Sequence, residues 1–157
     1  MRKRLATILA TLMVSFGLTV VGTVALAPVA QAAYCRYLYK YDSVQTDYGQ
    51  YKTVTIRLYS CDHGSYERLG NIRFTWPSGT TYIRKLYDSG SGDTNIRMRC
   101  NSSSWTTIKN NANYYNGTSY ALDKNCSDSS FAYVRVDLTP DTVWWIDTDV
   151  YQTFNLN

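Results

Sequence analysis

The sequence predicts an all-β domain: a small antiparallel β-sandwich of the Greek-key type, held together by two disulfide bonds. Three observations predict this fold class. The chain is rich in Thr, Tyr, Ser and Asn and has a single glutamate, Glu67, a composition that disfavours helices. It also contains four cysteines. Four short segments repeat an apolar residue, an arginine and a second apolar residue: Ile56-Arg57-Leu58, Ile72-Arg73-Phe74, Ile96-Arg97-Met98 and Val134-Arg135-Val136.

The repeated segments predict strands. In a β-strand successive side chains point to opposite faces, so each segment buries its two apolar residues and turns its arginine the other way. If the four strands share a sheet, their arginines line up on one face. The neighbours on these strand faces are mostly Thr, Tyr, Asn and Asp. Such mixed faces also form ordinary cross-strand hydrogen bonds and ion pairs in solvent, which is the alternative role for each arginine.

The N-terminal segment has the pattern of a secretory signal peptide over residues 1–32. The basic start Arg2-Lys3-Arg4 precedes an apolar run, and Ala30-Gln31-Ala32 has the small residues of a cleavage site. The long run resembles the signals of Gram-positive bacterial secreted proteins, and an uncleaved membrane anchor is the alternative. We therefore expect residues 33–157 to form a single secreted, extracellular domain that is not inserted in a membrane.

Removal of the signal peptide changes the charge of the protein. The mature net charge is near +1, because three of the 16 Lys and Arg residues and none of the 12 acidic residues lie in residues 1–32. A near-neutral domain lacks the broad basic surface that attracts nucleic acid. We expect no nucleic-acid partner.

The cysteine spacing predicts the disulfide pairing. The same number of residues separates Cys35 from Cys61 and Cys100 from Cys126, and these two bridges are the favoured pairing of the three possible ones. By alternation, Cys61 falls on the arginine side of its strand, whereas Cys100 falls on the apolar side. Burial of both bridges therefore requires a bulge or a strand end, which we expect near Ser60.

Residues 34–41 alternate cleanly and predict an edge strand. One face carries a row of tyrosines, Tyr37, Tyr39 and Tyr41, and the other carries basic residues. We expect the tyrosines to cover the core and the basic residues to lie in water, because Tyr is readily half-buried. The alternative is that the tyrosines form an exposed stacking platform for a sugar or a protein.

Four further strands follow in the first two thirds of the chain, at residues 51–60, 71–76, 80–87 and 94–100. Pro77-Ser78-Gly79 separates the second of these from the third. Since this is a turn sequence, we expect the two strands to form a hairpin.

The last third is less regular. Residues 101–113 have roughly helical spacing and predict a helical turn. Asn116-Gly117 predicts a type I′ hairpin. Residues 131–138 predict a strand that ends at the turn Thr139-Pro140-Asp141, and residues 142–156 predict the last strand or bent pair of strands.

Catalytic chemistry has weak support. Glu67 and the sole histidine, His63, lie close in sequence and would suit acid–base cleavage of RNA, but a polar turn after a disulfide is the simpler interpretation. Asp147 and Asp149 share a strand face beside aromatic residues. Positions of this kind lie about 7 Å apart, which fits glycoside hydrolysis poorly. We expect no catalytic residue and a protein that is not an enzyme.

Metal and cofactor sites have equally weak support. Oxidised cysteines cannot bind zinc, and His63 alone is not a site. Asp88 and Asp93 bracket a Gly- and Ser-rich loop that offers calcium only two carboxylates, so a mobile hairpin tip is the favoured interpretation. We expect neither a metal nor a cofactor.

The abundance of Tyr, Trp and Arg favours a binding module, because these residues dominate interface hot spots. We expect a secreted or cell-surface protein as the partner, with a glycan as the other possibility. A protease inhibitor with a stiff loop at residues 77–81 and a lectin with a shallow aromatic cleft are the alternatives. The candidate face comprises Tyr37, Tyr39, Tyr41, Arg57, Tyr59, Arg73, Arg97, Arg135, Trp145 and Tyr151.

Overall fold

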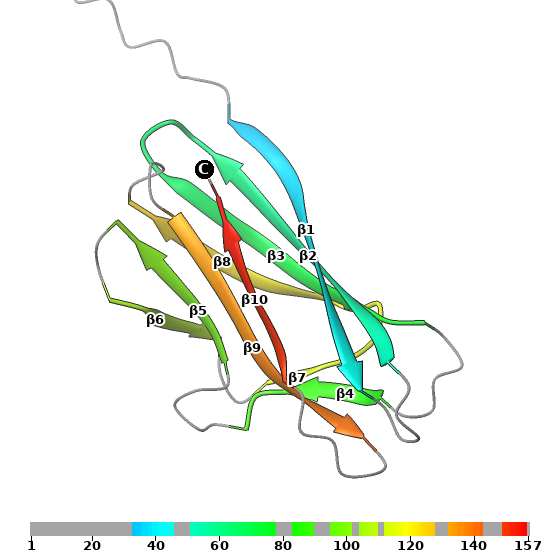
Figure 1. Cartoon of the computed structure of the whole chain (residues 1–157). Helices are drawn as coiled ribbons and strands as arrows, with labels where there is room; N and C mark the ends of the chain where they lie inside the picture. Colours follow the sequence, from blue (N-terminus) through cyan, green and yellow to red (C-terminus); the bar gives the residue numbers. More distant parts are fainter. Residues whose placement is uncertain are drawn as a thin grey trace, which may run out of the picture. The chain divides into compact units, whose positions relative to one another are not determined.

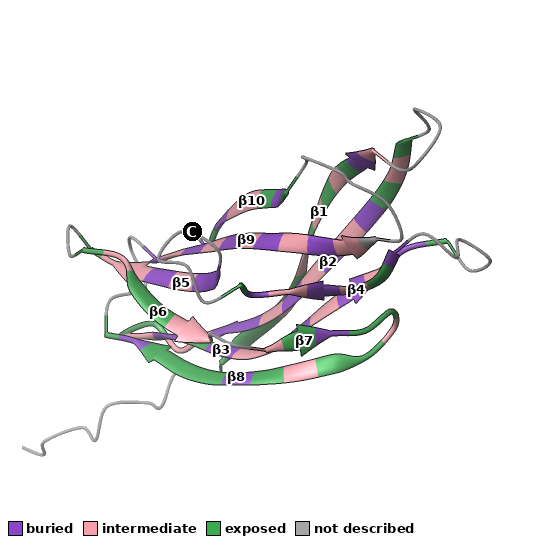
Figure 2. Ribbon diagram, turned by 90° about the horizontal axis from the view of Figure 1, so that it is seen from below, coloured by how far each residue is buried: buried purple, intermediate pink, exposed green. Residues whose placement is uncertain are grey.

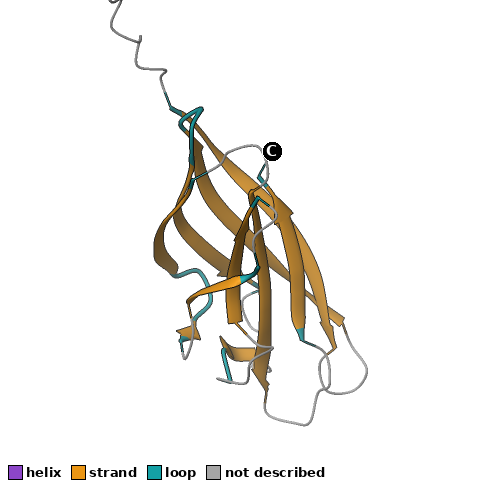
Figure 3. Cartoon of the chain, turned by 90° about the vertical axis from the view of Figure 1, so that its left-hand side faces the viewer, coloured by secondary structure: helices purple, strands orange, loops and turns teal. Residues whose placement is uncertain are grey.

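A computed structural model describes residues 33–45, 51–77, 83–89, 95–101, 104–109, 112–127, 132–142 and 149–156. Every described residue belongs to one compact unit, Gln31–Asn157. The predicted signal peptide lies outside the described residues. The described residues form strands, turns and irregular segments (Figure 3). Among them, no helix is long and apolar enough to cross a membrane.

The predicted all-β fold is confirmed, with every strand pair antiparallel. The strands are β1 Tyr34–Gln45, β2 Tyr51–Asp62, β3 Glu67–Thr75, β4 Ile83–Tyr87, β5 Asn95–Cys100, β6 Thr106–Lys109, β7 Asn113–Tyr114, β8 Ser119–Cys126, β9 Ala132–Thr142 and β10 Val150–Asn155.

These strands form two sheets that pack together as a sandwich (Figure 1). The first sheet has the order β1-β2-β3-β8. The second has the order β6-β5-β9-β4-β7, and β10 also pairs with β9. The chain passes from one sheet to the other between β3 and β4, between β7 and β8, and between β8 and β9. The topology is therefore not a simple meander, and the arrangement is consistent with the predicted antiparallel β-sandwich.

The core lies between the two sheets, and the repeated apolar–Arg–apolar segments form much of it. In all four segments both apolar residues are buried and the arginine is half-buried on the outer side. Figure 2 shows the resulting alternation of buried and less buried positions along β9. The strand prediction made from these segments is confirmed. The buried apolar residues are Ile56, Leu58, Ile72, Phe74, Ile96, Met98, Val134 and Val136.

One open side of the sandwich is closed by β1 and β10, the edge strands of the two sheets. The Arg36 guanidinium donates a hydrogen bond to the carbonyl oxygen of Leu156. The Tyr151 backbone N–H donates to Oδ2 of Asp42 at 2.7 Å, and the Gln152 amide donates to the carbonyl oxygen of Tyr41 at 3.1 Å. These contacts satisfy polar groups of β1 that a free edge would expose.

Both predicted disulfides, Cys35–Cys61 and Cys100–Cys126, are confirmed. The first joins directly opposed residues of β1 and β2, and the second joins β5 of one sheet to β8 of the other. Cys100–Cys126 therefore holds the two sheets to each other. Such bonds persist in oxidising, extracellular-type environments.

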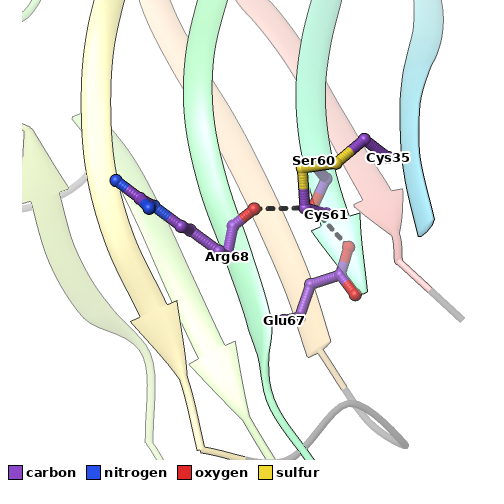
Figure 4. The surroundings of a disulfide bond; sticks show 5 residues. All are labelled: Cys35, Ser60, Cys61, Glu67 and Arg68. Atoms are coloured by element: carbon purple, nitrogen blue, oxygen red, sulfur yellow. Dashed lines mark hydrogen bonds between the residues drawn. A yellow bond between two sulfur atoms is a disulfide. The ribbon is translucent and has the colours of Figure 1, made fainter. Parts of the chain in front are cut away.

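The irregularity predicted near Ser60 exists, but only half of the first disulfide is buried: Cys61 is buried and Cys35 is exposed. The register of β2 with β3 shifts between Tyr59 and Ser60, and the extra residue is Gly70 of β3. Pairing with β1 stays regular there, so Cys61 keeps the side of Tyr59 and Cys35 is exposed. Figure 4 shows this bridge beside Ser60, which turns to the opposite side and contacts Glu67.

Three predicted turns are wrong. The strands before and after Pro77 are not a hairpin, because β3 and β4 belong to different sheets. For the same reason Asn116-Gly117 joins β7 to β8 without forming a hairpin, and only Gly117 has a positive φ, so the turn is not type I′. Pro140 lies within β9 instead of ending it.

The position of Pro140 has a simple physical reason. The last residues of β9 pair with β4 on one side, where Pro140 lies opposite Leu86. The partners on either side of the first half of β9, β5 and β10, do not reach this far. Because one edge carries no ladder there, a residue without an N–H group is tolerated. The predicted helical turn in residues 101–113 is also wrong, since β6 occupies Thr106–Lys109.

Candidate functional site

The outer face of the first sheet carries most of the predicted binding residues. In the register of β1 with β2, Tyr37 lies opposite Tyr59, and Tyr39 lies opposite Arg57. In the register of β2 with β3, Arg57 lies opposite Arg73. All of these side chains point away from the core, because the residues between them in each strand point inward. We call this surface the tyrosine–arginine face; it consists of Tyr37, Tyr39, Tyr41, Arg57, Tyr59 and Arg73.

The tyrosines of β1 are exposed, which corrects the expectation that they cover the core. Tyr37, Tyr39 and Tyr41 are 49%, 50% and 62% exposed. The opposite side of β1 faces inward, where Leu38 packs partly against the core. Its basic residues lie at the sheet edge, so their long side chains can cover apolar surface while their charges reach polar partners such as the Leu156 carbonyl. The structure instead agrees with the alternative, in which the three tyrosines form an exposed aromatic platform.

Contacts among the aromatic rings order part of this face. The rings of Tyr37 and Tyr59 have centroids 5.0 Å apart. The Arg57 guanidinium lies 4.6 Å from the centroid of the Tyr37 ring, within cation–π distance. The side chains at this end of the face are thus held by one another, which lowers the entropy that a ligand has to remove on binding.

Two open pockets in the described part of the first sheet are of interest: one lies within the tyrosine–arginine face and the other borders it at Tyr59. The larger, the Tyr59 pocket, has a volume of about 560 Å³ and is lined by Tyr59, His63, Gly70, Asn71 and Asp123 among others. The smaller, the arginine pocket, has a volume of about 270 Å³ and is lined by Tyr39, Thr55, Arg57, Arg73 and Thr75. Each pocket offers an aromatic ring beside hydrogen-bonding groups.

Gly70 shapes the Tyr59 pocket and was missed by the sequence analysis. A Cβ atom at this position would lie 2.7 Å from Cδ1 of Tyr59, so the Tyr59 ring rests directly on the glycine backbone. The register of β3 shifts at Gly70 with both neighbouring strands. An isolated glycine inside a strand pattern indicates such a bulge or close approach, so the signal was present in the sequence.

The predicted single face of four arginines does not exist. Arg57 and Arg73 oppose each other on the first sheet, whereas Arg97 and Arg135 oppose each other on the second. Strands with the apolar–Arg–apolar pattern occur in both sheets, because the strands of each sheet need the same alternation of apolar and polar side chains. Trp145 lies outside the described residues.

Two arginines of the second sheet, Arg99 and Arg135, contact aromatic rings. The guanidinium groups of Arg99 and Arg135 lie 5.0 Å and 4.9 Å from the Trp105 ring. Arg99 also lies 4.9 Å from the Tyr133 ring, and Arg135 lies 5.8 Å from the Tyr151 ring. The result is an aromatic–arginine ladder. Arg99, Trp105 and Tyr133 were not among the predicted site residues, although Arg99 follows Arg97 at the same-face spacing.

Trp105 is expected to contribute measurably to stability through this ladder. Replacement by leucine removes two cation–π contacts, each worth about 0.5–1 kcal/mol at an exposed site, and should lower the unfolding free energy by about 1–2 kcal/mol. Replacement by phenylalanine keeps a ring and should cost less. Urea titration of both variants measures the difference, and equal losses would show that the guanidinium contacts contribute nothing.

The predicted alternative of acid–base catalysis by His63 and Glu67 finds no support in the geometry. Glu67 points into the sandwich and is 1% exposed, with Ser60 Oγ donating a hydrogen bond to Oε1 (Figure 4). His63 stacks on Tyr66, with ring centroids 4.4 Å apart, and lines the Tyr59 pocket. The two groups therefore do not share a cleft.

Burial makes Glu67 a source of pH-dependent stability. Desolvation raises the pKa of this carboxyl above its usual value of 4.5, and the hydrogen bond from Ser60 and the charge of Arg36 only partly oppose the shift. Because the folded pKa is raised, the stabilising contribution is complete below about pH 4.5 and is lost as pH rises through the folded pKa.

Replacing Glu67 by glutamine should therefore increase the unfolding free energy at pH 7, by about 1 kcal/mol, and change it little at pH 4. The difference between variant and wild type isolates Glu67 from the other titrating groups. Denaturant titrations of both proteins from pH 4 to 8 give this difference, with Asp62→Asn as a control at a less buried neighbouring acid. A variant that is less stable than wild type at pH 7 would contradict the assignment.

Only some residues of the remaining candidate sites lie in the described parts of the chain. Within the described parts of the chain, no three His, Cys, Asp or Glu side chains are grouped to hold a metal ion. Asp88 is buried, while Asp93, its predicted calcium partner, lies outside the described residues. Asp149 is exposed, and Asp147 lies outside. Of the predicted inhibitor loop, only Pro77 is described, and it is exposed.

Comparison with known proteins gives no relatives. No family model, no curated protein and no solved structure matches this chain.

Proposed function

We propose that this protein is a secreted, non-enzymatic binding module that recognises a protein partner through its tyrosine–arginine face. The single observation that carries the proposal is the exposure of a row of large aromatic side chains on β1, with Tyr37, Tyr39 and Tyr41 each about half exposed or more. Exposed aromatics gathered on one sheet mark interaction surfaces more often than they serve stability.

The chemistry of the face suits a protein interface. Tyrosine and arginine are enriched in interface hot spots because they combine a large contact area with hydrogen-bonding groups. Tyr51, 64% exposed, lies on β2 at the same-face spacing as Arg57 and Tyr59 and extends the aromatic surface. Cys35–Cys61 joins β1 to β2 within this sheet and Cys100–Cys126 links the sheet to the second one, so the face is largely formed before binding. A role as an adaptor or accessory subunit of an extracellular assembly follows from such a surface.

Affinity capture tests the proposal. The tagged protein and its Tyr39→Ala/Arg57→Gln variant are incubated in parallel with culture supernatant and with surface proteins of the producing cells, and the retained proteins are identified by mass spectrometry. We expect one stoichiometric protein that wild type retains and the variant does not. Equal recovery of every protein by both baits would refute recognition through this face.

A glycan is the second candidate ligand, and the Tyr59 pocket is the observation that favours it. Its volume of about 560 Å³ lies in the range of small-molecule sites, and Tyr59, Asn71 and Asp123 supply a ring for stacking and polar groups for hydroxyls. A glycan array distinguishes the two candidates. Binding to one glycan class, lost in Gly70→Val because the Tyr59 ring is displaced, would favour the lectin alternative.

A further inference from the structure

The two arginines of the tyrosine–arginine face lie in an electrostatically unfavourable arrangement. Arg57 and Arg73 are directly opposed across β2 and β3. Side chains in such pairs start about 5 Å apart, and like charges in this position are destabilising. A folded protein tolerates this arrangement at low cost only if something else neutralises the pair.

The described residues do not supply that neutralisation. The ion pairs found in them are Arg68–Asp123 and Lys85–Asp141, both at 3.9 Å, and neither involves Arg57 or Arg73. The Nε atoms of Arg57 and Arg73 are shielded from solvent and have no hydrogen-bond partner among these residues. Among the described residues, the arginine pocket between them is lined by Tyr39, Thr55 and Thr75 and by no carboxylate.

The arginine pair of the second sheet provides the comparison within the same molecule. Arg97 and Arg135 are opposed in the same way. There, Arg135 contacts the Trp105 and Tyr151 rings and donates a hydrogen bond of 3.5 Å to the Tyr151 hydroxyl. Asp137 follows Arg135 at the same-face position of β9, so that face carries its own negative charge. In the first sheet, Arg57 also contacts a ring, that of Tyr37, and the Nε of Arg135 is as unpartnered as those of Arg57 and Arg73. The difference is the charge: the same-face neighbours of the first pair within β2 and β3 are Thr55, Tyr59, Asn71 and Thr75, none of them acidic.

We propose that Arg57 and Arg73 form a carboxylate-binding site that receives an aspartate or glutamate side chain of the protein partner. This inference rests on the proposed function. Two guanidinium groups match the two oxygens of a carboxylate, and Thr55, Thr75 and Tyr39 add hydroxyl groups around it. A pocket of about 270 Å³ accommodates one side chain and not a large ligand. The flanking tyrosines cover the rim and exclude water from the charged contact.

Isothermal titration at low salt tests this site with a hexaglutamate peptide as the probe. The full-length gene is expressed, and wild type is compared with Arg57→Gln/Arg73→Gln and with the matched pair Arg97→Gln/Arg135→Gln. We expect the first variant to bind the peptide at least about tenfold more weakly and the second less than twofold more weakly. Equal losses in both variants would mean unspecific attraction and would overturn the proposal.

Further arms of the experiment separate the remaining explanations. The Arg57→Lys/Arg73→Lys variant keeps the positive charges but loses the planar guanidinium groups, and it should also bind the peptide more weakly than wild type. Full retention of affinity would refute recognition of a carboxylate by two guanidinium groups. Arg57 and Arg73 could instead bind a sulfated heparin hexasaccharide and not hexaglutamate. That result would refute a protein carboxylate as the ligand and would favour a sulfated glycan.

Thermal unfolding tests whether the pair is structural. The melting temperature of Arg57→Gln/Arg73→Gln should be equal to or higher than that of wild type, because the substitution removes a repulsion. A marked decrease would overturn the proposal. The captured partner could bind the Arg57→Gln/Arg73→Gln variant as tightly as wild type and yet fail to bind the Tyr39→Ala variant. That result would refute the carboxylate site while the proposed function stands. Peptide binding at the pair without any captured protein would support the site and refute the proposed protein partner.

Discussion

Replacing Cys100 and Cys126 together by alanine is expected to lower the unfolding free energy by about 3–4 kcal/mol, the largest stability effect that we predict for this protein. The bond closes a loop with a sequence separation of 26 and joins β5 of one sheet to β8 of the other. Its loss both frees the unfolded chain and removes the covalent link between the layers. Cys126 is fully buried, so alanine also leaves space in the core.

The other disulfide is the matched control for this prediction. Cys35–Cys61 has the same sequence separation of 26, and the entropy gained by the unfolded chain is therefore the same. However, it joins neighbouring strands that are already paired, and Cys35 is exposed. Guanidinium titrations should show a larger loss for Cys100→Ala/Cys126→Ala than for Cys35→Ala/Cys61→Ala. The reverse order would contradict the role of the second bond as the link between the sheets.

Replacing Tyr39 by alanine is expected to weaken binding of the captured partner by about 30-fold or more, the loss typical of an interface hot spot. Tyr39 lies in the middle of the tyrosine row, opposite Arg57, and lines the arginine pocket. It is 50% exposed, so its replacement removes contact area for a ligand without opening the core.

Tyr151 is the matched control for Tyr39. It is also 50% exposed but lies on β10 of the second sheet. Tyr151→Ala should change the affinity less than twofold in the same surface plasmon resonance assay. If Tyr151→Ala weakened binding as much as Tyr39→Ala, the partner would not be restricted to the tyrosine–arginine face.

The strands and the core were predictable because both depend on local alternation. A segment such as Ile56-Arg57-Leu58 specifies which side chains are buried whichever strand it pairs with. The disulfide pairing was predicted from the short, equal separations of Cys35 from Cys61 and of Cys100 from Cys126. These features need no knowledge of how the strands are ordered.

The order of the strands was not predictable from the same signals. Pro77-Ser78-Gly79 and Asn116-Gly117 indicate a change of direction, but a turn sequence does not specify whether the next strand stays in the sheet or crosses to the other one. The division of the four arginines between two sheets follows from that order. The single predicted face was therefore wrong even though each strand was right.

The orientation of β1 was ambiguous for a different reason. Its two faces carry tyrosines on one side and Arg36, Leu38 and Lys40 on the other, and both kinds of side chain can be half-buried. Only the neighbouring edge decides between them, because the residue after β10, Leu156, offers its carbonyl group to Arg36 on the basic side. The register shift at Gly70 that shapes the Tyr59 pocket likewise depends on strands from three parts of the chain.

Tyrosine nitration in the presence and absence of the captured partner tests the central claim most directly, because it maps the bound surface side chain by side chain. Tetranitromethane modifies exposed tyrosines, and mass spectrometry of the peptides locates each modified residue. We predict that Tyr37, Tyr39 and Tyr41 lose reactivity in the complex while Tyr151 keeps it. Protection of Tyr151 with unchanged reactivity of the three β1 tyrosines would contradict recognition through the tyrosine–arginine face.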